Sequence, residues 1–247
     1  MDSLFAQQLL EKTRRDYDAI ALSFSETRER VYDLQLLVSD VKSGERVLDV
    51  GCGNGRLLDA LPVGVEYTGG DTSEQMIAIA KSRHIIPLPT IRFLRCDILS
   101  LPFAPASFDH VFALAVLHHI PSSVLRQQAV AQLVQVVKPG GRITITVWDL
   151  RHWYWLRRYH LWRLLFGLHP KEYDRGDCLI PWRRGVAHPL MRYVHTFTRK
   201  ELQALLRDAG CDILAETHTR NYMIVARRPV AEKMHSMYGK RRKIYAQ

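Results

Sequence analysis

The sequence has no long apolar run and few cysteines. No stretch of its 247 residues approaches the roughly 18 apolar residues that a membrane-spanning helix needs, so we expect no membrane association. The first residues, MDSLFAQQLLEKTRRDYD, contain acids and lack the apolar centre of a signal peptide. No two cysteines form a CxxC pair, so we expect no zinc or other metal site. These absences favour reduced thiols and a cytoplasmic protein, which in a eukaryote could also enter the nucleus.

Charge is ordinary in amount and uneven in distribution. Residues 1–141 hold 14 Lys and Arg against 16 Asp and Glu, whereas residues 142–247 hold 21 against 9. The net charges are therefore −2 and +12, which add up to the +10 of the whole chain. A basic second half favours a polyanionic partner, nucleic acid first, although a solvated basic surface is the simpler alternative.

A glycine-rich stretch, RVLDVGCGNG, occupies residues 46–55. Val47 to Val50 predict a buried strand, and three alternating glycines follow before a helical pattern begins at Arg56. Such a turn lets the backbone approach a ligand, and a helix N-terminus beyond it would offer free N–H groups. A tight strand-to-helix turn can also require glycines for structural reasons alone.

Acidic residues follow the next two predicted strands. Asp71 ends a strand over 65–70 and can accept hydrogen bonds from ribose hydroxyls, as in dinucleotide-binding folds. However, the first loop carries Asp49 and no GxGxxG, and a carboxylate there would repel a pyrophosphate and suits a cationic ligand. Asp97 follows a strand over 91–95 and can accept from an adenine amine, or it can cap a loop.

Strands and helices continue to alternate along the chain. We predict helices over 3–22, 27–39 and 122–137, a turn at VKPGG (137–141), and strands over 110–114 and 142–148. A helix over 198–209 begins with a Thr198/Glu201 capping box, and a hairpin follows over 213–217 and 222–226. This order predicts an α/β fold with a mostly parallel sheet whose ligands lie at the carboxyl ends of the strands.

In order, spacing and chemistry, residues 40–150 resemble the class I S-adenosylmethionine (SAM) methyltransferases. The resemblance implies a Rossmann-like, seven-stranded sheet with an antiparallel last strand, and SAM as cofactor. It also implies that an N-terminal segment lies over the cofactor. The cofactor-binding residues that it implies are Tyr17, Asp49, Gly51, Gly53, Gly55, Asp71, Thr72, Asp97, Ile98 and Ala113.

One methyltransferase domain is predicted over residues 1–247. Its parts are N-terminal helices (1–40), a SAM-binding core (41–150), an insertion (151–197), a C-terminal helix and hairpin (198–228) and a basic tail (229–247). The insertion holds four of the five tryptophans together with many arginines, a combination that suits base stacking and phosphate pairing. An amphipathic helix over 153–168, packed on the sheet, is the structural alternative for its apolar members.

Four outer stretches narrow the resemblance: YDAIALSFSETR, GDCLIPW, RYVHTFTRKEL and RNYMIVARR. They resemble the tRNA wobble-uridine methyltransferases, which methylate the carboxylate of 5-carboxymethyluridine, and the related domain fused to AlkB-type tRNA hydroxylases. The resemblance implies tRNA as partner, and relatives work with a small zinc-binding activator subunit. An ionised carboxylate needs no general base, so the expected catalytic residues position it: Arg28, Arg192 and Asn221, with His118 or His119 at the pocket mouth.

Other interpretations stay open at this level. Methyltransferases acting on small molecules share the same core, and a non-catalytic RNA-binding or scaffold subunit could keep the fold. His118 can instead close a turn, and Arg28 can lie on a helix surface.

Overall fold

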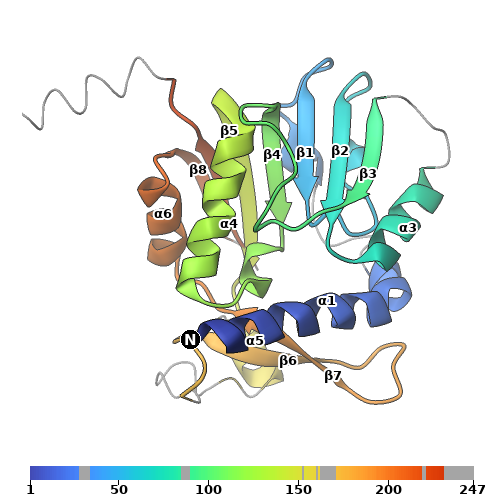
Figure 1. Cartoon of the computed structure of the whole chain (residues 1–247), viewed down its shortest axis with the longest axis vertical. Helices are drawn as coiled ribbons and strands as arrows, with labels where there is room; N and C mark the ends of the chain where they lie inside the picture. Colours follow the sequence, from blue (N-terminus) through green and yellow to red (C-terminus); the bar gives the residue numbers. More distant parts are fainter. Residues whose placement is uncertain are drawn as a thin grey trace, which may run out of the picture.

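A seven-stranded sheet stands at the centre of the computed structural model (Figure 1). The structure describes residues 1–27, 34–84, 90–151, 153–159, 161, 171–218 and 221–230. In spatial order the strands are β3 (Ile91–Arg95), β2 (Glu66–Asp71), β1 (Arg46–Val50), β4 (Phe108–Leu114), β5 (Val137–Trp148), β9 (Asn221–Arg227) and β8 (Asp212–His218). Only β9 runs antiparallel to its neighbours, so the predicted fold class is confirmed.

Helices cover both faces of this sheet. On the face turned to the viewer in Figure 1, α4 (Ser123–Val136) and α6 (Arg199–Asp208) pack on the largest apolar cluster. On the other face, α2 (Leu34–Val38) and the 3-10 turn η1 (Leu58–Ala60) pack on Val47, Tyr67 and Phe112. α3 (Glu74–Arg83) contacts the edge strand β3. Burial on both sides explains why β1 is a continuous apolar run broken only by Asp49.

The first helix, α1 (Ser3–Glu26), lies across one end of the sheet, at the carboxyl ends of the strands (Figure 1). The prediction that it ends near residue 22 is wrong, because the serines do not break it. The Ser23 hydroxyl donates to the carbonyl of Ile20, one turn earlier in the same helix. The side chain therefore makes its hydrogen bond inside the helix and does not draw the backbone out of it. The extra turn brings Phe24 and Ser25 above the glycine loop.

Two other predicted elements differ. No α-helix begins at Arg56, where η1 is only a three-residue 3-10 turn, so the expected helix N-terminus is missing. The predicted VKPGG turn is the start of β5, whose Val137 pairs with Phe108 across an irregularity in the sheet. Of the helix predicted over 27–39, the structure describes only α2, since residues 28–33 lie outside the described part.

The insertion contributes a second, two-stranded sheet that the sequence did not predict. α5 (Trp153–Arg158) is followed by a hairpin of β6 (Asp177–Trp182) and β7 (Leu190–His195). Leu156 and Leu161 pack with Ile180 and Val194 of this hairpin, so the apolar face of the predicted helix is directed at the hairpin. Residues 160, 162–170 and most of the tail, 231–247, lie outside the described residues.

No helix in the described ranges is long and apolar enough to cross a membrane. The same ranges contain no cluster of histidine, cysteine and carboxylate side chains arranged to hold a metal ion.

Candidate functional site

A cavity of about 300 Å³ opens at the carboxyl ends of β1, β2 and β4, beneath α1. Eight of the ten predicted cofactor residues line it: Tyr17, Asp49, Gly51, Gly53, Asp71, Thr72, Asp97 and Ile98. Strands that run in parallel bring residues from distant parts of the sequence to one edge, which is why these positions meet.

The glycine loop is folded tightly against the neighbouring strand and η2 (Leu117–His119). Gly51 has a φ of 71°, and a β-carbon on it would lie 2.2 Å from the Cγ2 atom of Val116, so only glycine fits. Gly53 has a φ of 55° and open space beside it. Its N–H donates to Asp71, which fixes the loop to the end of β2. The loop is therefore held in shape without the helix that the sequence predicted.

Two carboxyl groups stand in the cavity wall, Asp49 buried and Asp71 half-buried. Burial raises the pKa of Asp49 to about 7, although the Tyr67 hydroxyl donates to it at 2.9 Å. Burial also raises the pKa of Asp71, against the lowering effect of backbone donors that include Gly53 and Ser73. A cationic ligand would favour the charged forms of both groups. The wall thus suits a ligand that carries positive charge and hydroxyl groups.

Asp97 fits both of the roles that the sequence left open. It lines the cavity, and its Oδ1 accepts from the backbone N–H of Leu99, so it also shapes its own loop.

Helix α1 is tied to the cavity rim by side-chain hydrogen bonds. The Asn54 side chain in the glycine loop donates to the Ser25 hydroxyl at 2.8 Å. The Ser73 hydroxyl before α3 donates to Asp18 at 2.6 Å. These contacts hold α1 over the cavity, as the resemblance implied for the N-terminal segment. The cavity-lining residues that sequence reasoning missed include Arg14, Asn54, Arg56 and Ala115.

Three predicted site residues do not line the cavity, and a fourth belongs to the part of the chain that the structure does not describe. Gly55 does not line the cavity, and its neighbour is the Phe93 ring. Ala113 is fully buried within β4, and Ala115 lines the cavity after the strand has ended. His118 is fully buried outside the cavity. Arg28 lies outside the described residues.

Of the two adjacent histidines expected at the mouth of the cavity, the structure selects His119. It lines the cavity, its Nε2 lies 2.7 Å from the Tyr17 hydroxyl, and its Nδ1 lies 2.9 Å from the carbonyl oxygen of Tyr193. Because a carbonyl only accepts, Nδ1 carries the proton, and in the neutral ring Nε2 accepts from Tyr17. His119 therefore links α1 and the cavity to β7. From the sequence the choice between the two histidines stayed open, because Ala115, with a φ of 61°, changes the direction of the chain after β4.

Arg192 is the most unusual charged side chain near the cavity. It is 4% exposed, and its guanidinium carbon lies 5.3 Å from the Trp148 ring centroid and 4.9 Å from that of Trp182. Within the described residues its Nε and Nη1 atoms are buried without a hydrogen-bond partner. A buried cation with unused donors is costly to the fold, and a carboxylate ligand would satisfy it. Arg192 precedes Tyr193, the hydrogen-bond partner of His119.

Asn221 begins β9 and is the register partner of Trp148. It is half-buried and does not line the cavity. The structure thus brings Asn221 and Arg192 to the same tryptophan.

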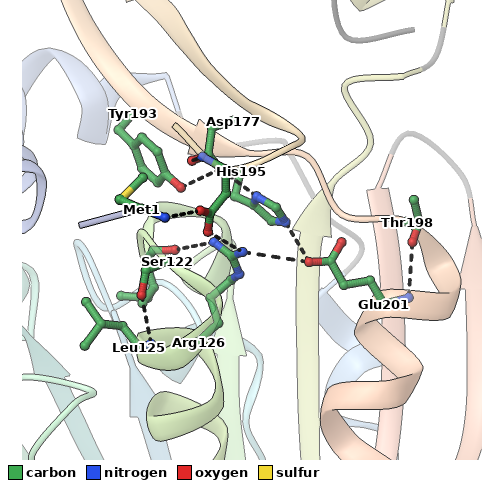
Figure 2. A network of polar contacts seen from close by, with 11 residues as sticks. Met1, Ser122, Leu125, Arg126, Asp177, Tyr193, His195, Thr198 and Glu201 are labelled. Atoms are coloured by element: carbon green, nitrogen blue, oxygen red, sulfur yellow. Dashed lines mark hydrogen bonds and ion pairs between the residues drawn. The ribbon is translucent and has the colours of Figure 1, made fainter. Parts of the chain in front are cut away.

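A buried polar network holds the β6–β7 hairpin against the main fold (Figure 2). His195 bonds to Asp177 at 2.7 Å and to Glu201 of α6 at 2.8 Å. Arg126 of α4 is 2% exposed and lies within ion-pair distance of Glu201 and Asp174. Glu201 was predicted to complete a capping box, but only the Thr198 half forms, because its carboxylate turns to His195 and Arg126. The network fixes the strand that carries Arg192.

An exposed aromatic and basic surface lies on α5. Trp153 is 64% exposed and Tyr154 is 48% exposed, and Arg157 and Arg158 are exposed beside them. This is the described part of the insertion that matches the composition of a nucleic-acid-binding surface.

Comparison with known proteins places this chain among methyltransferases. Residues 48–145 match the model of a family described as a methyltransferase domain. A protein of Encephalitozoon cuniculi named as a methyltransferase is 34% identical over 209 residues, which cover 81% of this chain and 87% of that protein.

The tRNA (carboxymethyluridine(34)-5-O)-methyltransferase of Arabidopsis thaliana is 37% identical over 135 residues, which cover 54% of this chain. The match spans only 32% of the length of that protein, and similarly short shares of the other curated relatives named for tRNA methylation. Among solved structures, a chain from the complex of the Haloferax volcanii Trm112 methyltransferase activator with a methyltransferase shares the fold. Its TM-score is 0.64 at 19% identity, over 88% of this chain and 98% of that chain.

Proposed function

Because the chain belongs to the class I SAM-dependent methyltransferases, we propose that it methylates tRNA. We propose further that the acceptor is the carboxylate of 5-carboxymethyluridine at the wobble position. The observation that carries this proposal is Arg192, a buried cation near the cofactor cavity whose Nε and Nη1 nitrogens have no hydrogen-bond partner among the described residues. An arginine N–H donates a charge-assisted hydrogen bond to a carboxylate.

The residues of the cavity fit SAM. The carboxylates of Asp49 and Asp71 would hold its cationic and hydroxyl-bearing parts, and the open backbone at Gly53 leaves room for it. When bound, SAM supplies a methyl carbon on a sulfonium, which passes to a carboxylate oxygen as the C–S bond breaks and an ester bond forms, without loss of a proton. The chain's own task is to position the acceptor, which can contribute roughly 7–11 kcal/mol.

Three observations support tRNA as the acceptor. The second half of the chain carries a net charge of +12. α5 presents Trp153, Tyr154 and two arginines to solvent. Relatives of 30–37% identity over their matched parts are named for tRNA carboxymethyluridine methylation.

We also propose a small activator subunit as a partner. The support is the likeness of this fold to that of a methyltransferase solved in complex with an activator. Co-purification and a rise in methyl transfer on addition of a Trm112-type protein would test this proposal. Full transfer by the chain alone, unchanged by the activator, would contradict it.

The decisive experiment is methyl transfer to an anticodon stem-loop that carries 5-carboxymethyluridine, followed by nucleoside mass spectrometry. We expect the methyl ester from the carboxymethyl RNA and no product from the same RNA with uridine. Transfer to a small carboxylic or phenolic compound in place of RNA would favour a small-molecule methyltransferase. Bound SAM without transfer to any acceptor, with the activator present, would favour a non-catalytic subunit.

The role of Arg192 has its own test. Arg192→Ala should lower kcat/KM for the carboxymethyl RNA about ten- to hundredfold, the value of a charge-assisted hydrogen bond, and leave SAM affinity unchanged. Arg192→Lys keeps the charge without the paired donors and should recover only part of the loss. Equal loss of SAM affinity in Arg192→Ala would contradict the assignment.

A further inference from the structure

Six planar side chains form a closed cycle of contacts beside the cofactor cavity. Tyr17 contacts Phe24 with ring centroids 5.2 Å apart, Phe24 contacts Trp182 at 5.6 Å, and Trp182 lies under the Arg192 guanidinium at 4.9 Å. The cycle closes through Trp148, which lies 5.3 Å from Arg192 and 5.7 Å from the His119 ring, and His119 lies 5.2 Å from Tyr17. We call this set of side chains the collar.

The members of the collar come from five separate elements. Tyr17 and Phe24 lie on α1, His119 on η2, and Trp148 at the end of β5, while Trp182 and Arg192 lie on the two strands of the hairpin. Elements so far apart in sequence converge on one ring, and the polar network behind the hairpin holds two of the members in place. The collar is therefore a built feature of the fold.

The collar borders the cofactor cavity. Tyr17, Phe24 and His119 line the cavity, whereas Trp182 and Arg192 do not. Trp182 and Phe24 are both half-buried, so each keeps part of its ring accessible. Phe24 and Trp182 are therefore the accessible members on this side, and the buried Arg192 guanidinium lies against the Trp182 ring.

The chemistry of the collar selects a class of ligand. Aromatic faces stack on planar rings of any sequence, and the unused donors of Arg192 favour an anion. A planar heteroaromatic ring with a short carboxylate arm satisfies both features at once. A non-planar acceptor, or a planar one without the anion, satisfies only one of them.

We infer that Phe24 and Trp182, whose rings touch each other, together present a stacking surface for the acceptor nucleobase, with its carboxylate arm directed at Arg192; we call this surface the slot. This inference rests on the proposed function and goes beyond it, because it assigns recognition of the base itself to these two side chains. A base within a stacked loop is inaccessible, so the acceptor nucleotide turns out of the anticodon loop to enter the slot.

The experiment compares two acceptors in the same stem-loop: 5-carboxymethyluridine, and its 5,6-dihydro analogue, whose ring is not planar. The wild-type protein should show a KM about tenfold or more lower for the planar acceptor, the range expected for loss of one stacked base. Trp182→Ala should raise KM for the planar acceptor by a similar factor, leave SAM affinity unchanged and remove the preference for planarity. Trp182→Phe keeps a stacking face and should retain most of the preference.

Trp153→Ala is the matched control, since Trp153 lies in the same insertion but outside the collar. It should keep the preference for the planar acceptor even if it weakens RNA binding. Phe24→Leu provides a second slot variant in case Trp182→Ala unfolds, which thermal melting would reveal, and it should also reduce the preference.

The outcomes separate the slot from the proposed function. Transfer by the wild type with the same planar preference in Trp182→Ala and Phe24→Leu would overturn the slot and leave the proposed function standing. Failure of the wild type to methylate either RNA, with SAM bound and the activator added, would overturn both.

Discussion

Asp49 shows what a single buried carboxyl group contributes to this molecule. Its pKa is raised to about 7 by burial. In the unfolded chain the same group ionises near pH 4, so between about pH 4 and 7 the folded protein keeps a proton that the unfolded chain has lost. The contribution of Asp49 to stability therefore falls as pH rises through this window. A bound cation favours the ionised form of Asp49, so a cationic ligand should bind more tightly when Asp49 is ionised.

We therefore expect SAM affinity to rise with pH up to about 7 and then to level off. Asp49→Asn should bind SAM more weakly and without this rise. Isothermal titration from pH 5.5 to 8.5 measures both proteins. A rise of equal size in Asp49→Asn would assign the dependence to another group.

Gly51 and Gly53 form a natural pair for a second test. Both have positive φ, but a β-carbon would meet Val116 only at Gly51. Gly51→Ala should destabilise the protein by about 1–3 kcal/mol more than Gly53→Ala, because it adds a steric overlap to the same backbone strain. Urea unfolding without ligand gives the difference, and equal losses would mean that the Val116 side chain moves aside freely.

At the scale of elements, the β6–β7 hairpin depends on charges buried behind it. Burial raises the pKa of Glu201, but hydrogen bonding to His195 and the nearby charges of His195 and Arg126 outweigh burial, so its pKa is lowered overall. A carboxylate with a lowered pKa stabilises the folded state at pH values above its unfolded pKa of about 4.5. This stabilisation is lost as pH falls through the lower folded value, so acid should loosen the hairpin.

Arg126→Met tests the network directly. It leaves the half-buried carboxylates of Asp174 and Glu201 without their shared arginine and should cost about 1–3 kcal/mol of stability. Hydrogen exchange over 177–195 should speed up, while SAM affinity changes little. Arg157→Met is the control, since Arg157 is exposed on α5 and should leave exchange in the hairpin unchanged.

The strands of the main sheet could be predicted because most are runs of apolar or β-branched residues, and some, such as β1 and β2, end at a glycine or an acid. The β6–β7 hairpin could not, because its aromatic and basic residues fit a helix or a binding surface equally well. The eight predicted residues that line the cavity lie in the glycine loop, at strand ends or, for Tyr17, on α1. The choice between His118 and His119 stayed open because it depends on the backbone angle of Ala115, which no residue type fixes.

For the whole molecule, the dominant property is the contrast between a nearly neutral cofactor half and a basic second half. Phosphate contacts made by the basic half release counterions, so affinity for RNA falls steeply with salt.

We expect KM for the tRNA to rise at least tenfold between 50 and 200 mM salt, a change that needs about two phosphate contacts on a helix or about two to three on single-stranded RNA. SAM affinity, measured in parallel by titration, should change little over the same range. A KM for RNA that is insensitive to salt would mean that the basic surface is only solvated.

The hydrogen bonds that fasten α1 across the cavity, from Asn54 to Ser25 and from Ser73 to Asp18, have a kinetic consequence. α1 covers the cavity, and an acceptor bound at the collar would cover its remaining side. We therefore expect SAM to be unable to enter once the acceptor is bound. Turnover then follows a compulsory order, in which the methyl donor arrives first and the demethylated donor leaves last. The demethylated donor should therefore inhibit competitively with respect to SAM and non-competitively with respect to the RNA.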